Sequence, residues 1–208
     1  MSELNHAYQA GGPALLIQTI ENNFKIGIDY YVQVDFYSFI DVIDAFGGVY
    51  IDVTDATLMN YINGYVSELN HIEGKEEGFS FLSQPGYQLL NGRQALGYSR
   101  IRIIGTDFAR TGRQRTVLQA LITRVKAKPW LVFKAASRVL PDLSTNISDN
   151  RMSLLFVEMI PLLAANNIRQ FQVPVDHYWS NALMDNGQEV LSIDFANNNE
   201  QLRSAIYK

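Results

Sequence analysis

Apolar and polar residues alternate from Ile28 to Phe36, which predicts a half-buried strand. Apolar residues at helical spacing follow from Tyr37 to Phe46, and the pair Gly47-Gly48 predicts the end of that helix. The segment Val49 to Val53 then alternates again and predicts a second strand. A strand, a helix, a glycine pair and a strand in this order indicate a βαβ unit, so we expect a partly parallel sheet.

Helical spacing dominates the rest of the chain. Asp55 to Gln84 is the least regular part, and we interpret it as a surface excursion and a candidate flexible lid. Asn91 is a good cap for a short helix through Tyr98, Ser99 to Gly105 is expected to be extended or looped, and a long helix begins near Asp107. The remaining expected elements are helices over Pro13–Asn23, Leu131–Leu140, Ser148–Asn166 and Asn198–Tyr207, and a late strand over Arg169–Pro174.

Length and composition fit one α/β domain over residues 1–208. The chain has 208 residues, of which 47% are hydrophobic and 18% charged, and it shows neither an internal repeat nor a linker. It has no cysteine, which excludes disulfides, thiol catalysis and cysteine-based zinc sites. No stretch approaches the roughly 18–20 apolar residues that span a bilayer, and the N-terminus does not have the pattern of a signal peptide.

Positive charge is concentrated in Asn91 to Lys128, which carries nine of the seventeen basic residues and a single acid, Asp107. The chain as a whole has a formal net charge of −4, which argues against a dedicated nucleic-acid binder. Because the planar guanidinium forms paired contacts with phosphate or carboxylate, we interpret the stretch as a site for an anionic ligand. A solvated helix face is the alternative.

Four residues of this stretch suit one ligand. Arg110 and Gln114 are four apart on the predicted long helix, near an N-terminus whose free N–H groups favour anions. Arg100 and Arg102 would point the same way if their segment is extended. A surface ion pair is the alternative for each arginine, but five arginines between Arg100 and Arg115 cannot all be paired with one acid.

Other chemistry has fewer candidates. Metal binding would rely on carboxylates, and oxygen ligands would favour Mg²⁺ over zinc. We interpret His6 as a buried structural histidine, with a place in a site as the alternative. No serine nucleophile motif, P-loop or dinucleotide fingerprint is present. The carboxylates considered are Asp29, Asp35, Asp41, Asp44 and Asp52.

Four stretches together carry a family resemblance: LNHAY followed by a glycine pair, IDYYVQVDFYSFIDVIDAFGGVYIDV, GYQLLNGRQALGYSRIR and DFARTGRQRTVLQAL. In this order and spacing, over about Leu4 to Leu121, the chain resembles the LytR-CpsA-Psr family, whose domain was formerly called the cell-envelope-related transcriptional attenuator. The resemblance after Lys128 is loose.

The resemblance implies an α-β-α sandwich with a central mixed β-sheet, on the outer face of the plasma membrane of a Gram-positive type bacterium. It implies transfer of polyprenyl-pyrophosphate-linked anionic glycopolymers, of the teichoic acid or capsule type, to peptidoglycan with the help of Mg²⁺. On the family's motifs, Arg100, Arg102 and Arg110 would be catalytic and would bind the pyrophosphate together with Gln114 and Arg113. Asp107 would bind the metal.

The N-terminal part of the family pattern is missing. Family members have a membrane helix and an early strand-rich segment that supplies a metal-binding aspartate and a further arginine, and the chain shows neither. We therefore expect a fragment that lacks N-terminal strands, whose parent is the enzyme and is held at the membrane by a segment absent here. A polyprenyl-phosphate- or glycan-binding module without catalysis, and a regulator acting through nucleic acid, stay open as alternatives.

Overall fold

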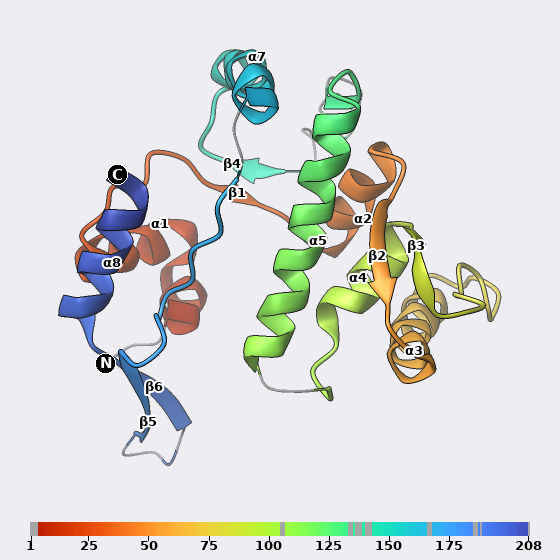
Figure 1. Cartoon of the computed structure of the whole chain (residues 1–208), viewed down its shortest axis with the longest axis horizontal. Helices are drawn as coiled ribbons and strands as arrows, with labels where there is room; N and C mark the ends of the chain where they lie inside the picture. Colours follow the sequence, from red (N-terminus) through yellow and green to blue (C-terminus); the bar gives the residue numbers. More distant parts are fainter. Residues whose placement is uncertain are drawn as a thin grey trace. The chain divides into compact units, whose positions relative to one another are not determined.

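The computed structural model describes most of the chain, and its residues fall into two compact units (Figure 1). One unit comprises Met1–Tyr31 with Asn167–Lys208, and the other comprises Val32–Asn166. We describe each unit by itself. The described residues are 4–104, 107–132, 135, 139, 143–165, 168–184, 187 and 189–207, with the backbone alone for Asn5, Asp107, Phe156, Ile160 and residues 163–165.

Helices surround a small antiparallel sheet in the unit Val32–Asn166. Strand β2 (Val49–Val53) pairs antiparallel with β3 (Gly86–Leu90) over its whole length, from Val49 opposite Leu90 to Val53 opposite Gly86. Two short strands, β1 (Val32–Gln33) and β4 (Ser144–Thr145), form a separate antiparallel pair. The helices of this unit are α2 (Phe36–Ala45), α3 (Ala56–Ile72), α4 (Gly92–Arg100), α5 (Asp107–Ala127) and α7 (Asp149–Ala165).

The predicted parallel βαβ unit is wrong, because β1 pairs with β4 and β2 pairs with β3. The predicted strand Ile28–Phe36 shrinks to Val32–Gln33, and its alternate apolar side chains do not form a buried face, since Val34 and Phe36 are about half exposed. Asp35 ends the extended segment. Its carboxylate accepts a hydrogen bond from the backbone N–H of Ser38 at 2.7 Å, which caps α2 and holds the pKa of Asp35 below its usual value.

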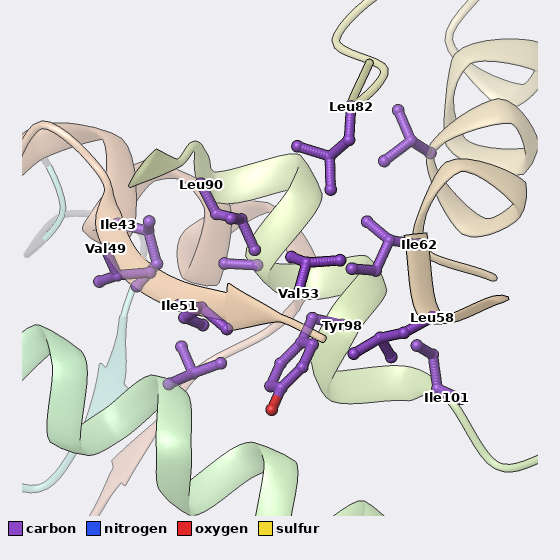
Figure 2. Packing of buried hydrophobic residues seen from close by; sticks show 13 residues of the cluster. Ile43, Val49, Ile51, Val53, Leu58, Ile62, Leu82, Leu90, Tyr98 and Ile101 are labelled. Carbon is purple, nitrogen blue, oxygen red and sulfur yellow. The ribbon is translucent and has the colours of Figure 1, made fainter. Parts of the chain in front are cut away.

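The hydrophobic core lies on the inner face of β2 (Figure 2). Val49, Ile51 and Val53 are almost completely buried there, while the residues between them are exposed, so the predicted alternation of this strand is confirmed. Helices α3 and α4 supply partners such as Ile62 and Tyr98. Burial of these branched side chains is the main favourable term holding the unit together.

The segment Asp55–Gln84 was predicted to be an irregular excursion, and that prediction is wrong for its first half. Asp55 caps the 17-residue helix α3, and apolar residues at helical spacing bury one face of it. The residues after α3 are also anchored: the Asn63 amide accepts from the N–H of Leu82 at 2.8 Å and donates to its carbonyl at 2.9 Å. Buried Asn70 donates to the carbonyl of Phe79 at 2.8 Å.

Helix α4 begins where the sequence predicts. The Asn91 side chain accepts from the N–H of Gln94, and the Gln94 side chain accepts from the N–H of Asn91, which forms a reciprocal capping box. The N–H of Gly92 donates to the Asp44 carboxylate at 2.7 Å, and a Cβ on Gly92 would lie 2.7 Å from the Cα of Ile40. Only glycine therefore allows α4 to start this close to α2.

The predicted ends of α2 and α5 are also confirmed within a residue or two. Gly47 and Gly48 have positive φ angles and donate to the carbonyls of Asp44 and Ile43, as expected for a glycine pair that ends a helix. Helix α5 spans Asp107–Ala127 and ends before Pro129, and α7 matches the predicted helix Ser148–Asn166. In the predicted helix Leu131–Leu140, Leu131, Val132, Ala135 and Val139 are helical, and the remainder lies outside the described residues.

The unit formed by Met1–Tyr31 and Asn167–Lys208 packs two helices, α1 (Leu4–Phe24) and α8 (Phe195–Tyr207), with an edge-to-face contact of Phe24 on Phe195. The predicted helix Pro13–Asn23 is the second half of α1, after a kink at Gly11-Gly12. The predicted terminal helix is α8, which starts three residues earlier than expected.

Two predictions for this unit are wrong. Arg169–Pro174 is not a strand; the strands are β5 (Trp179–Leu183) and β6 (Glu189–Ile193), which form an antiparallel hairpin. Instead of a sheet partner, the loop before β5 is held by buried Asn198, whose side chain accepts from the N–H of Val175 and donates to the carbonyl of Tyr178. His6 is exposed on α1 and is not a buried structural residue.

None of the helices in the described part of the chain combines the length and the hydrophobicity needed to cross a membrane.

The close approach at Gly92 can be tested with two glycine substitutions. We expect Gly92→Ala to lower the free energy of unfolding by about 1–3 kcal/mol, because the added methyl meets the α2 backbone. Gly64→Ala in α3 is the matched control. Outside the helix's own backbone, no atom lies within 4 Å of where the alanine Cβ would be, so this substitution should raise the free energy of unfolding by up to about 1 kcal/mol. Urea unfolding of both variants measures this, and an unchanged midpoint for Gly92→Ala would contradict the packing described.

Candidate functional site

The predicted anion site lies where α4 is followed by α5. Helix α4 ends at Arg100, the linking residues 101–104 leave the helix, and α5 begins at Asp107. Ile101 is completely buried in the core and fixes the start of the link, whereas Arg102 and Ile103 are exposed. Helices α4 and α5 pack against each other (Figure 1).

Arg113 anchors this link to α5. Its Nη2 donates to the carbonyl of Ile101 and, at 3.2 Å, to the carbonyl of Ile104. A cation that holds two carbonyls makes strong hydrogen bonds and satisfies groups that the helix end leaves without partners. The sequence predicted Arg113 in the substrate-binding set, and the structure gives it the task of shaping the loop that carries Arg102.

Arg100 is held between two aromatic rings. Its guanidinium carbon lies 4.4 Å from the ring centroid of Phe36 and 5.2 Å from that of Tyr65. Contacts over ring faces fix the plane of a guanidinium and leave its N–H groups free to point outward along its edge. The ring contacts therefore orient Arg100 for paired hydrogen bonds with two oxygens of an anion such as a phosphate.

Arg100 and Arg102 do not share one extended segment as predicted, because Ser99 and Arg100 still belong to α4. Arg100 is partly buried on the aromatic residues, and Arg102 is exposed in the link. The two side chains therefore leave the backbone in different settings, one from a helix and one from the link. The reason given from spacing is therefore wrong, and a shared site for the two arginines stays a prediction.

Arg110 and Gln114 lie one turn apart near the start of α5, as predicted. Arg110 is partly buried and Gln114 is exposed. The first turn of a helix carries free backbone N–H groups and a partial positive charge, both of which favour an anion. The side chain of Asp107, the predicted metal ligand, lies outside the described residues. Arg100 ends α4, Arg102 lies in the link, and Arg110 and Gln114 lie near the start of α5; we call these four residues the arginine junction.

Other arginines of the basic stretch have structural tasks. Arg93 pairs with Glu73 at the end of α3 and reaches Asn70 at 3.4 Å. Burial, the largest influence, would raise the pKa of Glu73, but the hydrogen bond and charge of Arg93, together with Lys75, bring that pKa below its usual value. Arg124 donates to the carbonyls of Phe46 and Gly47 at 3.3 and 3.1 Å and so caps the end of α2.

An apolar cavity of about 320 Å³ lies in the same unit as the arginine junction. Strand β1 and helices α2 and α7 contribute to its walls, which consist of hydrophobic side chains throughout. A cavity of this size and character suits a hydrocarbon group. No local pattern in the sequence could locate this cavity, since its walls come from segments far apart in the chain. The lining residues are Val32, Val42, Phe46, Val132, Ala135, Val139, Leu143, Ile147, Met152, Leu155 and Met159.

The carboxylates considered as metal ligands do not form a cluster. Within the described part of the chain, no group of three or more histidine, cysteine, aspartate and glutamate side chains is placed to hold a metal ion. Asp35 caps α2, and Asp44 accepts from Gly92. These two aspartates have the capping and tethering roles that such residues commonly take.

Comparison with known proteins matches the chain to one family. The LytR_cpsA_psr family model matches residues 1–204. Polyisoprenyl-teichoic acid–peptidoglycan teichoic acid transferase TagU of Bacillus licheniformis is 34% identical over 126 residues, which are 60% of this chain and 35% of TagU. Biofilm regulatory protein A of Streptococcus mutans is 33% identical over 150 residues, 70% of this chain and 34% of that protein.

Solved structures share the fold. The crystal structure of TagV from B. subtilis superimposes with a TM-score of 0.70 at 28% identity and covers 98% of this chain and 72% of TagV. TagT bound to LIIa-WTA gives a TM-score of 0.70 at 23% identity and the same 98% coverage of this chain, with 71% of TagT covered. The chain spans about a third of the length of the curated relatives just described. The chain combines helices with small antiparallel sheets, and its fold is the one that these solved structures share.

The different tasks of Arg113 and Arg102 predict different effects on stability. Arg113→Ala should lower the free energy of unfolding by about 1–3 kcal/mol, because the carbonyls of Ile101 and Ile104 lose their donor. Arg102→Ala, at an exposed position in the same link, should change it by less than about 0.5 kcal/mol. Urea denaturation of both variants measures the difference, and equal effects would show that Arg113 does not hold the link.

Proposed function

The chain belongs to the LytR-CpsA-Psr family, and on that premise we propose that its parent protein transfers a polyprenyl-pyrophosphate-linked anionic glycopolymer, of the teichoic acid or capsule type, to peptidoglycan. The names of TagU and TagV relatives as teichoic acid transferases support the reaction. Because this chain spans only part of those proteins, the activity is proposed for the parent, and binding of the pyrophosphate is proposed for the chain itself.

The arginine junction is the observation that carries this proposal. A pyrophosphate bears several negative charges within a few ångströms, and guanidinium groups fixed near a helix N-terminus provide matching donors. Arg100 is the best defined of them, since Phe36 and Tyr65 fix its plane. Arg110 and Gln114 would bind from the first turns of α5, and Arg102 from the link that Arg113 shapes.

The transfer would proceed as a phosphoryl substitution. An acceptor hydroxyl oxygen attacks the phosphorus that carries the glycopolymer, a new phosphodiester bond forms, and the bond to the bridging pyrophosphate oxygen breaks. The hydroxyl loses its proton, and the polyprenyl phosphate leaves with the electrons of the broken bond. Arg100 and Arg110 would stabilise the charge that grows on the leaving phosphate, which is the main task of a protein in this class of reaction.

The apolar cavity would hold the first part of the polyprenyl chain. Val42 of α2 and Phe46, the C-cap of α2, line it, and Phe36, whose ring contacts Arg100, stands at the start of that helix. A single lipid pyrophosphate would then place its charged part at Arg100, beside the start of α2, and its prenyl chain in the cavity near the end of α2. This arrangement would let the protein distinguish a lipid pyrophosphate from free pyrophosphate.

We further propose that the whole parent domain forms an α-β-α sandwich around a central mixed sheet, and that it acts on the outer face of the plasma membrane of a Gram-positive type bacterium. Mg²⁺ commonly binds through one or two carboxylates and the substrate's phosphates, and it would neutralise charge on them. Asp107 is the proposed carboxylate. Because the described residues contain no larger cluster of ligands, no catalytic step is assigned to the metal.

The proposed pyrophosphate contacts predict a loss of affinity in two variants. Arg100→Ala and Arg110→Ala should each weaken binding of farnesyl pyrophosphate by about 10- to 100-fold, the value of a hydrogen bond to a charged group. Lys126→Ala, which removes an exposed cation from the last turn of α5, is the matched control and should bind as the unmodified chain does. Isothermal titration calorimetry measures all three.

Unchanged affinity for farnesyl pyrophosphate in both arginine variants would show that the arginine junction does not bind it. In the parent protein, the same variants should lose glycopolymer transfer. Wild-type binding without any transfer by the parent would favour the alternative of a binding module without catalysis.

The cavity predicts a dependence on the prenyl chain. Val42→Phe would fill part of it, so farnesyl pyrophosphate should bind at least about tenfold more weakly while inorganic pyrophosphate binds as before. The same substitution at Val157, which is 59% exposed on α7, is the control and should alter neither affinity. Competition between farnesyl pyrophosphate and inorganic pyrophosphate measures the ratio of their affinities. An equal loss of affinity for both ligands in Val42→Phe would show that the prenyl chain does not bind in this cavity.

A further inference from the structure

The outer face of the β2–β3 pair carries a group of exposed side chains that the arginine junction does not use. Tyr50 and Asp52 project from β2, and Tyr87 and Leu89 project from β3. In the register of the pair, Tyr50 stands opposite Leu89 and Asp52 stands opposite Tyr87. Tyr87 is 73% exposed, which is far more than a tyrosine in a core or a packed interface shows.

The two tyrosines are stacked. They are diagonal neighbours across the strands, and their ring centroids lie 5.5 Å apart with an angle of 17° between the ring planes. The guanidinium carbon of Arg124 lies 5.5 Å from the centroid of Tyr50, and Arg124 is itself fixed by the carbonyls of Phe46 and Gly47. Tyr50 is thus held by Arg124 and by the strand, and Tyr87 rests on Tyr50.

This arrangement leaves Tyr87 with a large accessible ring surface beside a carboxylate. A ring fixed on a paired strand loses little conformational freedom when a ligand stacks on it. Asp52, directly opposite on β2, can accept hydrogen bonds from ligand hydroxyl groups within reach of that ring. We define Tyr50, Asp52 and Tyr87 as the tyrosine platform.

We propose that the tyrosine platform binds a neutral oligosaccharide, with the apolar face of one pyranose ring on Tyr87 and its hydroxyl groups donating to Asp52. A pyranose has both parts that this surface matches: a face of C–H groups for the ring and a rim of hydroxyl donors for the carboxylate. The carboxylate repels phosphate-bearing ligands, so the platform and the arginine junction select opposite kinds of ligand. The proposal does not depend on the transferase activity proposed above.

Titration of the chain Met1–Lys208 with the tetrasaccharide of N-acetylglucosamine, followed by ¹H–¹⁵N NMR, tests the proposal. Amide signals of residues 50–53 and 86–89 should shift, and inorganic pyrophosphate should not shift them. Tyr87→Ala should weaken the binding by about tenfold or more, because the stacking surface is lost. Tyr87→Trp should bind at least as well as the unmodified chain, since it keeps an aromatic face at the same place.

Tyr207→Ala is the matched control, since Tyr207 is 68% exposed on α8, and it should bind the tetrasaccharide normally. Arg100→Ala should also bind it normally, which separates this proposal from the pyrophosphate site. The proposal would be overturned if the tetrasaccharide shifted no amide signals in the unmodified chain, or shifted only those of other residues. An affinity of Tyr87→Ala equal to that of the unmodified chain would also overturn it. Loss of binding in Tyr87→Trp as well as in Tyr87→Ala would also overturn it, because the stacking face would then not be the determinant.

Discussion

The contact between α4 and α2 is the constraint on which the arginine junction depends. Gly92 lets the start of α4 meet the backbone of α2, and its N–H is tied to Asp44. From that fixed start, nine residues of helix carry the chain to Arg100, and α2 itself presents Phe36 to the Arg100 guanidinium. A shift of α4 on α2 would therefore separate Arg100 from Phe36. The packing of α4 against α2 thus determines how the Arg100 guanidinium is oriented.

The basic stretch combines two uses of arginine. Arg93, Arg113 and Arg124 hold helix ends and a loop by donating to carboxylate, amide or carbonyl oxygens within the chain. Arg100 has its plane fixed by aromatic rings, and that leaves the donor edges of the guanidinium for a ligand. A planar cation with several donors suits both tasks, so charge density alone overstates the size of the site. Among the structural arginines, Arg113 shapes the link that carries Arg102.

Much of the unit Val32–Asn166 could be predicted from local sequence signals. The strand Val49–Val53, the Asn91 cap and the start of α5 follow from alternation, capping chemistry and helical spacing, which act within a few residues. Helix α3 was missed because its segment contains Gly64, Gly74 and Gly78. Only Gly64 lies within the helix, and its cost is small compared with the gain from burying Ile62 and Val66. The partners of Arg100 and the apolar cavity could not be predicted, because they form between segments distant in sequence.

Binding of a lipid pyrophosphate at the arginine junction can be seen directly in a crystal structure of this chain with farnesyl pyrophosphate. We expect phosphate oxygens within hydrogen-bond distance of the guanidiniums of Arg100 and Arg110. Arg100 should still contact Phe36 and Tyr65, and the prenyl chain should lie in the apolar cavity. Pyrophosphate bound instead at Arg93 or at the basic end of α5, with the arginine junction empty, would contradict this expectation.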